Sequence, residues 1–276
     1  MVYKNLEFEC RDQIGWLTLN RPEKHNAISL EMINELHSFF ASLDEHLDIR
    51  VVILRGAGYA FCAGMDLLQA SGLYDESGTS DQKSAEDSPT YRLAVQKMFS
   101  QTIIRMRQAP QPLIAAVRGP AYGGGLSLAL GCDICLAGES ARFCAAFIRV
   151  GFSGCDMGSS YFMPRLIGLS RAAEYLYTGR VMDAATAERI GLVSRMVPDD
   201  QVDQAAEELA QEMLNATPLG LRMTKEVLNV NVDAPGLVAA AELENRTQIL
   251  CSFTEDAREA GRASFFEKRR PVYHDR

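Results

Sequence analysis

The sequence predicts an α/β fold that becomes helical toward its C-terminal end. Short apolar runs typical of buried strands alternate with amphipathic helices through about the first 140 residues. From Ser159 onward, apolar residues at helical spacing dominate. No repeat of fixed period and no clear linker interrupts the chain. We therefore expect an α/β core over residues 1–200 and a helical C-terminal region over residues 201–276.

The α/β part begins with a predicted strand at 14–20, which ends at the turn formed by Arg21 and Pro22. Apolar residues at helical spacing over 30–43 predict an amphipathic helix that returns the chain to a second strand at 51–55. The same alternation predicts four further elements: a helix at 91–108, a strand at 113–118, a helix at 125–131 and a strand at 133–137. This is the pattern of repeated β-α units.

The C-terminal part carries three apolar stripes at helical spacing, over 202–213, 237–250 and 257–266. Residues 71–90 differ from both parts because they are rich in Ser, Asp, Glu and Gly and have few apolar side chains. We expect a surface insertion there. Because this insertion follows the turn at 63–65, a lid over that turn is the alternative interpretation.

The charge balance and the apolar pattern exclude several classes of partner. The 276 residues include 28 Lys and Arg against 36 Asp and Glu, a net charge of −8. This disfavours nucleic acid and anionic membranes as partners, and the one basic cluster, 268–270, is short. The N-terminus has no export or import pattern and no apolar run approaches about 18 residues. We expect a cytoplasmic protein.

The cysteines point to reduced thiols. There are seven, scattered along the chain, and an odd, scattered set does not suit a disulfide framework. Cys132 and Cys135 form a lone CxxC without a second pair of ligands. We therefore expect neither a zinc site nor a redox site there.

The rest of the chain is organised around the glycine-rich stretch 119–127. It lies between an apolar strand and the start of a helix. Three consecutive glycines at 123–125 let the backbone amides approach a ligand, and a helix N-terminus adds unpaired N–H groups. Such a turn suits a phosphate or the developing oxyanion of a carbonyl. The Walker pattern is missing, so the oxyanion is favoured, and close helix–strand packing is the structural alternative.

A second apolar strand at 51–56 leads into another turn, Ala60-Phe61-Cys62-Ala63-Gly64-Met65-Asp66. Both turns, together with the stretches 20–27, 166–168, 176–179 and 187–193, resemble the crotonase (enoyl-CoA hydratase/isomerase) superfamily in the family's order over roughly residues 10–270. The resemblance implies a core of repeated ββα units wound into a spiral. It also implies C-terminal helices that cover the active site or a neighbouring subunit, in a homotrimer or a dimer of trimers.

The same resemblance implies an oxyanion hole and a coenzyme A site. The thioester oxygen of an acyl-CoA would accept hydrogen bonds from the backbone amides of Met65 and Gly124, and each such donor is worth on the order of 10²–10³ in rate. Acyl-CoA would be the substrate, and no metal, nicotinamide or flavin is expected. The positions expected near the coenzyme are Lys24, His25, Ala27, Ala63, Asp66 and Lys268.

The acid–base residues depart from the family's pattern. Enoyl-CoA hydratases hold the attacking water with two glutamates, and the corresponding positions here are Ser127 and Phe147. Asp156 lies in the region where dienoyl-CoA isomerases and 4-chlorobenzoyl-CoA dehalogenases carry a catalytic Asp, although the alignment needs one inserted residue. Asp156 is therefore a candidate base, with a helix N-cap as its structural alternative. Ser127 could position a water, or simply satisfy backbone groups.

These residues favour an acyl-CoA enzyme of the hydratase/isomerase type. Isomerisation, or another reaction that needs one base, fits them better than hydration. The alternatives are a non-catalytic acyl-CoA binding protein and a dehalogenase-like or thioesterase-like homologue that uses Asp156. The other nearby acids, Asp66, Glu139 and Glu174, are expected to lie on the surface.

Overall fold

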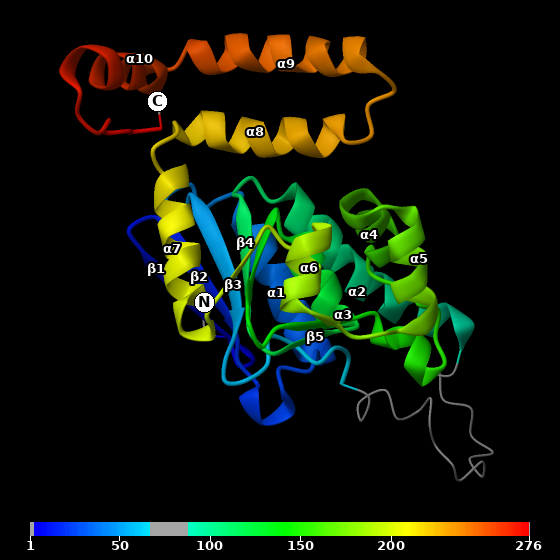
Figure 1. The fold of residues 1–276 in the computed structure, drawn as a ribbon. Coiled ribbons are helices and arrows are strands. Elements are labelled where there is room, and N and C mark those ends of the chain that lie inside the picture. The colour runs from blue at the N-terminus through cyan, green and yellow to red at the C-terminus, as the bar shows by residue number, and fades with distance from the viewer. Residues whose placement is uncertain (1–2, 67–87, 276) are drawn as a thin grey trace, which may run out of the picture.

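The computed structural model describes residues 3–66 and 88–275. A sheet flanked by helices forms the larger part, and a group of helices stands above it (Figure 1). This confirms the predicted α/β class. The insertion expected at 71–90, and with it the lid alternative, falls almost wholly outside the described residues and stays a prediction.

The main sheet has six strands in the order β1-β2-β3-β4-β6-β9. The first pair is antiparallel and the remaining pairs are parallel. A second sheet of three short strands has the order β5-β7-β8. The strands are β1 (Leu6–Arg11), β2 (Ile14–Leu19), β3 (Val51–Gly56), β4 (Leu113–Val117), β5 (Pro120–Tyr122), β6 (Ile134–Gly138), β7 (Arg142–Cys144), β8 (Met182–Asp183) and β9 (Arg195–Val197).

The α-helices of the described residues occupy the predicted stretches and several more. They are α1 (Leu30–Ser42), α2 (Pro89–Gln108), α3 (Gly124–Gly131), α4 (Ser159–Ile167), α5 (Leu169–Thr178), α6 (Ala184–Ile190), α7 (Val202–Met213), α8 (Pro218–Asn231), α9 (Leu237–Ser252) and α10 (Glu255–Gly261). The start of α1 shows the local cause, because the Ser29 side chain caps it by accepting a hydrogen bond from the Met32 amide.

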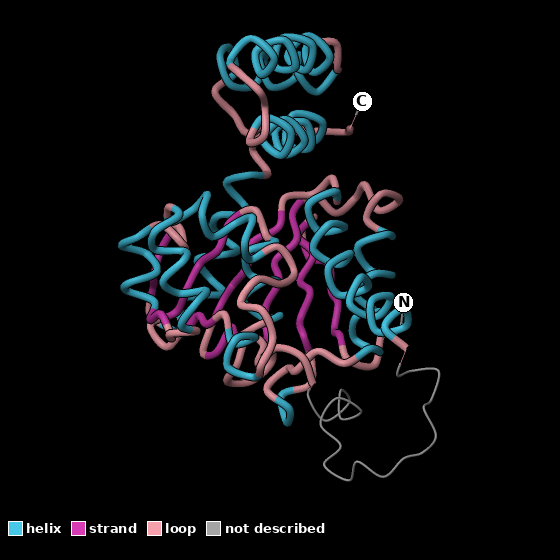
Figure 2. Tube along the Cα trace, turned by 90° about the vertical axis from the view of Figure 1, so that its right-hand side faces the viewer, coloured by secondary structure: helices cyan, strands magenta, loops and turns pink. Residues whose placement is uncertain are grey.

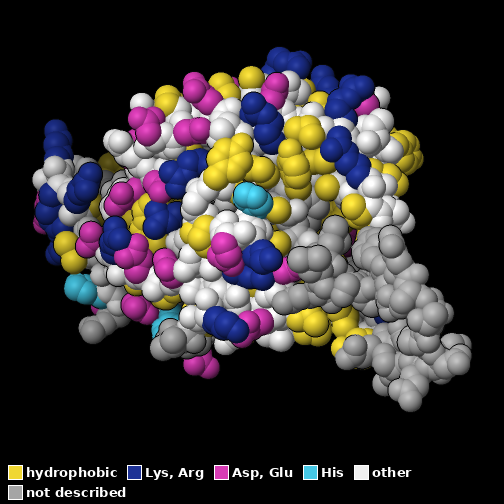
Figure 3. Space-filling model, turned by 90° about the horizontal axis from the view of Figure 1, so that it is seen from below, with side chains coloured by type: hydrophobic (Ala, Val, Ile, Leu, Met, Phe, Trp, Pro, Cys, Tyr) yellow, Lys and Arg dark blue, Asp and Glu magenta, His cyan; other side chains and the backbone are white. Residues whose placement is uncertain are grey.

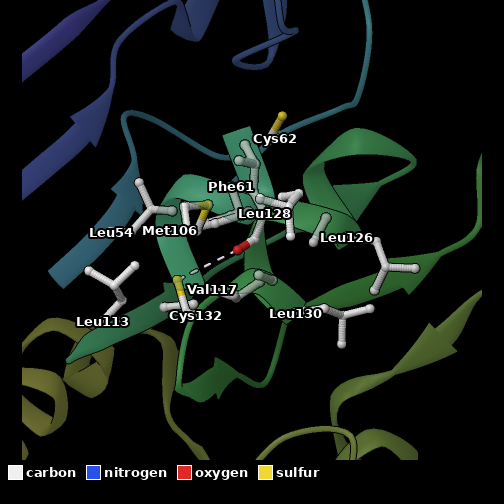
Figure 4. Packing of buried hydrophobic residues seen from close by; sticks show 14 of the residues in the cluster. Leu54, Phe61, Cys62, Met106, Leu113, Val117, Leu126, Leu128, Leu130 and Cys132 are labelled. Carbon is white, nitrogen blue, oxygen red and sulfur yellow. Dashed lines mark hydrogen bonds between the residues drawn. The ribbon is translucent and has the colours of Figure 1, made fainter. Parts of the chain in front are cut away.

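The hydrophobic core lies on both faces of the parallel sheet. Every residue of β2 and β4 is buried, as expected of parallel strands covered by helices on both sides. Helix α3 is buried along its whole length. Figure 4 shows Leu126, Leu128 and Leu130 of this helix among side chains from the strands and from α2. The core thus encloses the helix that follows the glycine-rich turn.

The CxxC cysteines are part of this core rather than a reactive site. The Cys132 thiol is buried and donates to the Leu128 carbonyl oxygen at 3.5 Å (Figure 4). Burial raises the pKa of the Cys135 thiol to about 12. Both thiols are therefore protonated at neutral pH, which disfavours thiolate chemistry.

The last helices leave the core. Figure 2 shows α8 and α9 as a layer above the sheet, joined to it by a narrow connection. Helix α7 belongs to the lower part, since it packs against β3, β4 and β6. The region expected over 201–276 therefore contains one helix that packs on the core and three, from Pro218 onward, that extend from it. Within the described residues, no helix is long and apolar enough to cross a membrane.

Candidate active site

Three loops meet at the carboxyl ends of the parallel strands, the usual position of a ligand site in such sheets. They follow β2, β3 and β4, at the lower edge of the sheet in Figure 1. Backbone hydrogen bonds join the last two: the Cys62 amide donates to Pro120 O, and the Tyr122 amide donates to Cys62 O, both at 2.9 Å. Figure 3 views this end of the molecule and shows hydrophobic side chains gathered near lysine and arginine side chains.

The glycine-rich turn needs its glycines for close backbone approach. Gly123 has a φ of 51° and precedes α3 without any side-chain cap. A Cβ on Gly125 would lie 2.2 Å from the Cys62 carbonyl oxygen. Helix α3 therefore begins at Gly124 with amides that no side chain satisfies.

The second turn lies directly against the first. A Cβ on Gly64 would lie 3.6 Å from the Gly124 nitrogen. Ile28 bonds to the residues on either side of Met65, because its amide donates to Gly64 O and its carbonyl accepts from Asp66 N. In such a parallel bridge the amide of Met65 points away from Ile28. Within the described chain, neither the Met65 nor the Gly124 amide donates a hydrogen bond to the backbone.

Asp156 lies beside the glycine-rich turn. The Ser127 hydroxyl donates to the Asp156 carbonyl oxygen at 3.3 Å, and the sulfur of Met157 lies 3.3 Å from where a Cβ on Gly124 would be. Burial raises the pKa of the Asp156 carboxyl, while hydrogen bonds from the Met157 amide and the Gln96 side chain oppose that shift. A residue whose carboxyl has a raised pKa thus lies on the segment that contacts the start of α3.

The helix-cap interpretation of Asp156 is wrong. Helix α4 begins at Ser159, its N-cap is Gly158, and no side chain caps it. The Asp156 carboxylate instead accepts a hydrogen bond at 2.7 Å from the amide of Met157, which precedes the helix. Met157 and Gly158 both have positive φ, so the chain turns between Asp156 and the helix, and the carboxylate does not reach the amides of the first turn.

Ser127 and Phe147, where the resemblance places the two glutamates of hydratases, also border the turn. Ser127 is fully buried, and its hydroxyl bonds to the backbone, as the structural alternative predicted. The ring of Phe147 lies 3.4 Å from the position of a Cβ on Gly123. Neither side chain is a carboxylate, so neither can act as a carboxylate acid or base.

The loop after β2 presents Lys24 and His25 to solvent. Sequence reasoning overlooked what holds it in place. The buried side chain of Asn26 donates to Ala57 O and Ala60 O, which ties the loop to the one after β3. The Arg21 side chain donates to Ala27 O at 2.6 Å. Ala27 in the loop after β2 and Ala63 in the loop after β3 are both partly exposed where the two loops meet.

The expectation that Asp66 lies on the surface is wrong. Its side chain is 8% exposed and forms an ion pair with Arg21 at 3.0 Å, because the loops after β2 and β3 enclose both groups. Glu139 and Glu174 are exposed, as predicted. Lys268 is exposed as well, but it follows α10 at the upper end of the molecule, away from the turns of its own chain (Figure 1).

A family model described as enoyl-CoA hydratase/isomerase matches residues 9–276. The chain belongs to the enoyl-CoA hydratase/isomerase family. It is 38% identical over 265 residues to a probable enoyl-CoA hydratase of Mycobacterium bovis, an alignment that covers 96% of this chain and 90% of the relative. It is 32% identical over 257 residues to the 1,2-epoxyphenylacetyl-CoA isomerase of Escherichia coli, covering 93% of each chain.

Solved structures of the family share the fold. An enoyl-CoA hydratase from Bacillus anthracis superposes with a TM-score of 0.90 at 32% identity, over 99% of this chain and 100% of that one. A putative enoyl-CoA hydratase from Streptomyces coelicolor gives 0.89 at 36% identity, over 100% and 96%. The crotonase resemblance of the sequence and its fold are thereby confirmed.

Proposed function

We propose that this enzyme moves a carbon–carbon double bond in an acyl-CoA thioester, with Asp156 as the single acid–base residue. The amides of Met65 and Gly124 hold the thioester oxygen. The observation that carries the proposal is the half-buried Asp156, whose backbone carbonyl accepts a hydrogen bond from Ser127 of α3 and whose neighbour Met157 packs against Gly124. A relative at 32% identity is named as an isomerase of an epoxyacyl-CoA, a name that supports isomerisation of a coenzyme A thioester but does not itself involve a moving double bond.

In the proposed reaction the Asp156 carboxylate removes a proton from the saturated carbon next to the thioester carbonyl. The electron pair left on that carbon delocalises onto the thioester oxygen, and the two amides stabilise the resulting enolate. Protonated Asp156 then returns the proton to another carbon of the same conjugated system. The double bond has moved and no atom has been gained or lost. Acyl-CoA is the substrate, and the proposal assigns no further cofactor.

Isomerisation is favoured over hydration because hydration requires a held and activated water. Ser127 is buried and bonds to the Asp156 carbonyl oxygen, and Phe147 covers Gly123 with an apolar ring. Neither group can take a proton from water. Asp156 would have to perform both proton transfers of a hydration alone.

The coenzyme is proposed to lie along the loops after β2 and β3. Lys24 and His25 offer exposed side chains for its phosphates or adenine, and the Ala27–Ala63 junction offers backbone next to the turn. Asp66 acts on this surface through Arg21, since the two form a buried ion pair. Lys268 is proposed to reach the coenzyme of a neighbouring subunit rather than of its own.

We further propose that copies of the chain associate, as a trimer or a dimer of trimers. Helix α9 has no buried residue within the described chain, and Val238 and Phe253 at its two ends are 78% and 73% exposed. Such a helix stabilises little unless another surface covers it.

The test is turnover of crotonyl-CoA, a 3-enoyl-CoA and a dienoyl-CoA by the wild-type enzyme and by Asp156→Asn, followed by absorbance of the conjugated thioester. We expect conversion of the 3-enoyl or dienoyl substrate, and a fall of about 10²–10⁴ in kcat for the variant. Asn keeps the size of the side chain but cannot take the proton.

Two results would contradict the proposal. Hydration of crotonyl-CoA that is insensitive to Asp156→Asn would remove Asp156 from the mechanism. Binding of all three thioesters without turnover would indicate that the protein binds acyl-CoA without catalysing a reaction. Glu174→Gln, a change of an exposed acid, is the matched control and should leave all rates unchanged.

A further inference from the structure

The side chain of Gln96 makes the second contact to the Asp156 carboxylate, and sequence reasoning did not identify it. Gln96 lies on α2, 60 residues earlier in the chain, and its Nε2 donates to Asp156 Oδ1 at 2.6 Å. The Met157 amide donates to the same oxygen at 2.7 Å. Both donors therefore bond to one of the two carboxylate oxygens.

We propose that Gln96 is a positioning residue that fixes Asp156 Oδ1 and thereby makes Oδ2 the atom that takes and returns the proton. This inference rests on the proposed function, because it assigns a role within that proton transfer. Gln96 itself does not exchange protons with the substrate. It acts only through the carboxylate.

The hydrogen bonds to Oδ1 explain why the proton would bind to Oδ2. A carboxylate oxygen that already accepts two N–H bonds has less electron density to offer a proton, so protonation occurs at the other oxygen. When Oδ2 carries the proton, Oδ1 is a carbonyl oxygen and still accepts from the same two donors. Oδ1 thus keeps its two hydrogen bonds in both protonation states. The proton can therefore move without rearrangement of the Gln96 and Met157 donors.

Helix α2 holds Gln96 firmly enough for this role. Its next turns bury Phe99 and Ile103, which are 3% and 4% exposed, in the core that also contains α3. The Met157 side of the contact is equally constrained, because Met157 is buried with a φ of 46°. The Asp156 carboxylate is therefore held by donors from α2 and from the turn at Met157, and both segments pack into the same core.

The pKa of Asp156 offers a direct readout of this contact. Burial raises that pKa most, and the hydrogen bonds from the Met157 amide and from Gln96 lower it. Within the described chain, the Met157 amide and the Gln96 side chain are the hydrogen-bond donors that shift this pKa, and neither carries a charge. Removing the Gln96 donor should therefore raise the pKa further, whereas a purely structural role of Gln96 would leave it unchanged.

The experiment compares Gln96→Leu and Gln96→Glu with wild type in the full-length enzyme. Gln101→Leu is the matched control, since it makes the same change at an exposed position of the same helix. One measurement is the carboxyl ¹³C titration of Asp156, identified by the signal that Asp156→Asn removes. The other is the pH profile of kcat and KM with the substrate that the wild type converts.

For Gln96→Leu we expect an upward shift of the Asp156 pKa, a fall of about 10-fold to 10²-fold in kcat and a KM within about twofold of wild type. Gln96→Glu should shift the pKa further upward, because a second carboxylate faces the first, and should regain activity at higher pH. Gln101→Leu should match wild type in every measurement.

The possible failures are distinguishable. If Gln96→Leu leaves both the Asp156 pKa and kcat at wild-type values, the role of Gln96 is overturned while the proposed function stands. If the pKa shifts upward but Asp156→Asn retains full activity, the hydrogen bond is real and the proposed function is overturned, and the positioning role fails with it.

Discussion

The core around the glycine-rich turn and the C-terminal helices α8–α10 are stabilised in different ways. In the core, α3 is buried at every residue and β2 and β4 are buried throughout. In the C-terminal group, α9 has no buried residue in the described chain, and α8 buries only Pro218 and Lys225. The core thus completes its own packing, whereas the C-terminal helices carry apolar side chains that their own chain leaves exposed.

Several polar contacts join the two regions, alongside the apolar contact of Leu221 of α8 with the core. Lys225 of α8 is 5% exposed, and its ammonium donates to Met106 O and Gln111 O and pairs with Asp133 at 3.0 Å. Arg50 donates to Leu214 O and Ala216 O in the segment that connects α7 to α8. Polar contacts of this kind add directional hydrogen bonds and charge pairing to the apolar packing of Leu221.

The largest expected difference in the free energy of unfolding is between a glycine-to-alanine substitution in the core and one in the C-terminal helices. In Gly125→Ala, the new Cβ would meet the Cys62 carbonyl oxygen at 2.2 Å, and we expect a loss of more than about 4 kcal/mol or failure to fold. In Gly261→Ala nothing lies within 4 Å, so helix propensity should stabilise by about 0.5–1 kcal/mol. Urea unfolding at fixed protein concentration measures both.

That contrast would break if the two alanine variants unfolded at the same urea concentration. Equal midpoints would mean that the backbone around Gly125 can move to admit a methyl group, and that the turn is less tightly built than its contacts indicate.

A smaller loss is expected from Lys225→Met, which keeps an unbranched side chain that is one atom shorter but removes the three polar contacts. Asp133 retains its ion pair with Arg107 at 2.8 Å, so the expected cost is about 2–4 kcal/mol rather than the full cost of an abandoned buried charge. Lys97→Met, at an exposed position of α2, is the control and should stay within about 0.5 kcal/mol of wild type. No difference between the two would show that α8 is held by something else.

The pKa values of carboxylates in the two regions are shifted in opposite directions, so acid should protonate them at different pH. Burial raises the pKa of Asp156 above its ordinary 3.8, so activity that needs the carboxylate should fall at a higher pH than for an exposed Asp. Hydrogen bonds from Arg269 and Arg262 lower the pKa of Glu259 from 4.5 to about 2. The stability that Glu259 contributes is present above 4.5 and is lost as the pH falls through about 2.

On acidification, the enzyme should therefore lose turnover before the contacts beside α10 weaken. The pH profile of kcat/KM reports the first event, and NMR signals of residues 255–269 report the second. Loss of the α10 signals at the pH where turnover falls would contradict this order.

The smallest expected effect on stability comes from the apolar surface of α9. Val238→Asp adds a charge in the first turn of α9, where the helix dipole favours it, so the unfolding free energy should change by less than about 0.5 kcal/mol. Leu169→Asp is the matched control, since both residues lie in a first turn and are 78% and 74% exposed. Light scattering should show a lower mass only for Val238→Asp. An unchanged mass would show that Val238 of α9 does not contribute to association between copies of the chain.

Elements whose signals are local could be predicted from the amino-acid sequence. Helical spacing predicted 30–43 and 91–108, which the structure forms as Leu30–Ser42 and Pro89–Gln108, and the apolar run at 113–118 forms β4. The glycines at 123–125 predicted a close backbone turn because only residues without a Cβ allow it. Membership of the family followed from stretches that each lie within a few residues.

Which side chains contact one another could not be predicted in this way, because it depends on the folded arrangement of distant segments. Gln96 and Asp156 are 60 residues apart, and Arg21 and Asp66 are 45 apart, so no local pattern indicates either pair. The Asp-before-helix signal at 156 misled because positive φ at Met157 and Gly158 delays the helix. Hydrogen bonds and ion pairs between distant segments depend on how the loops pack at the edge of the sheet, whereas periodicity reports only which face of an element is apolar.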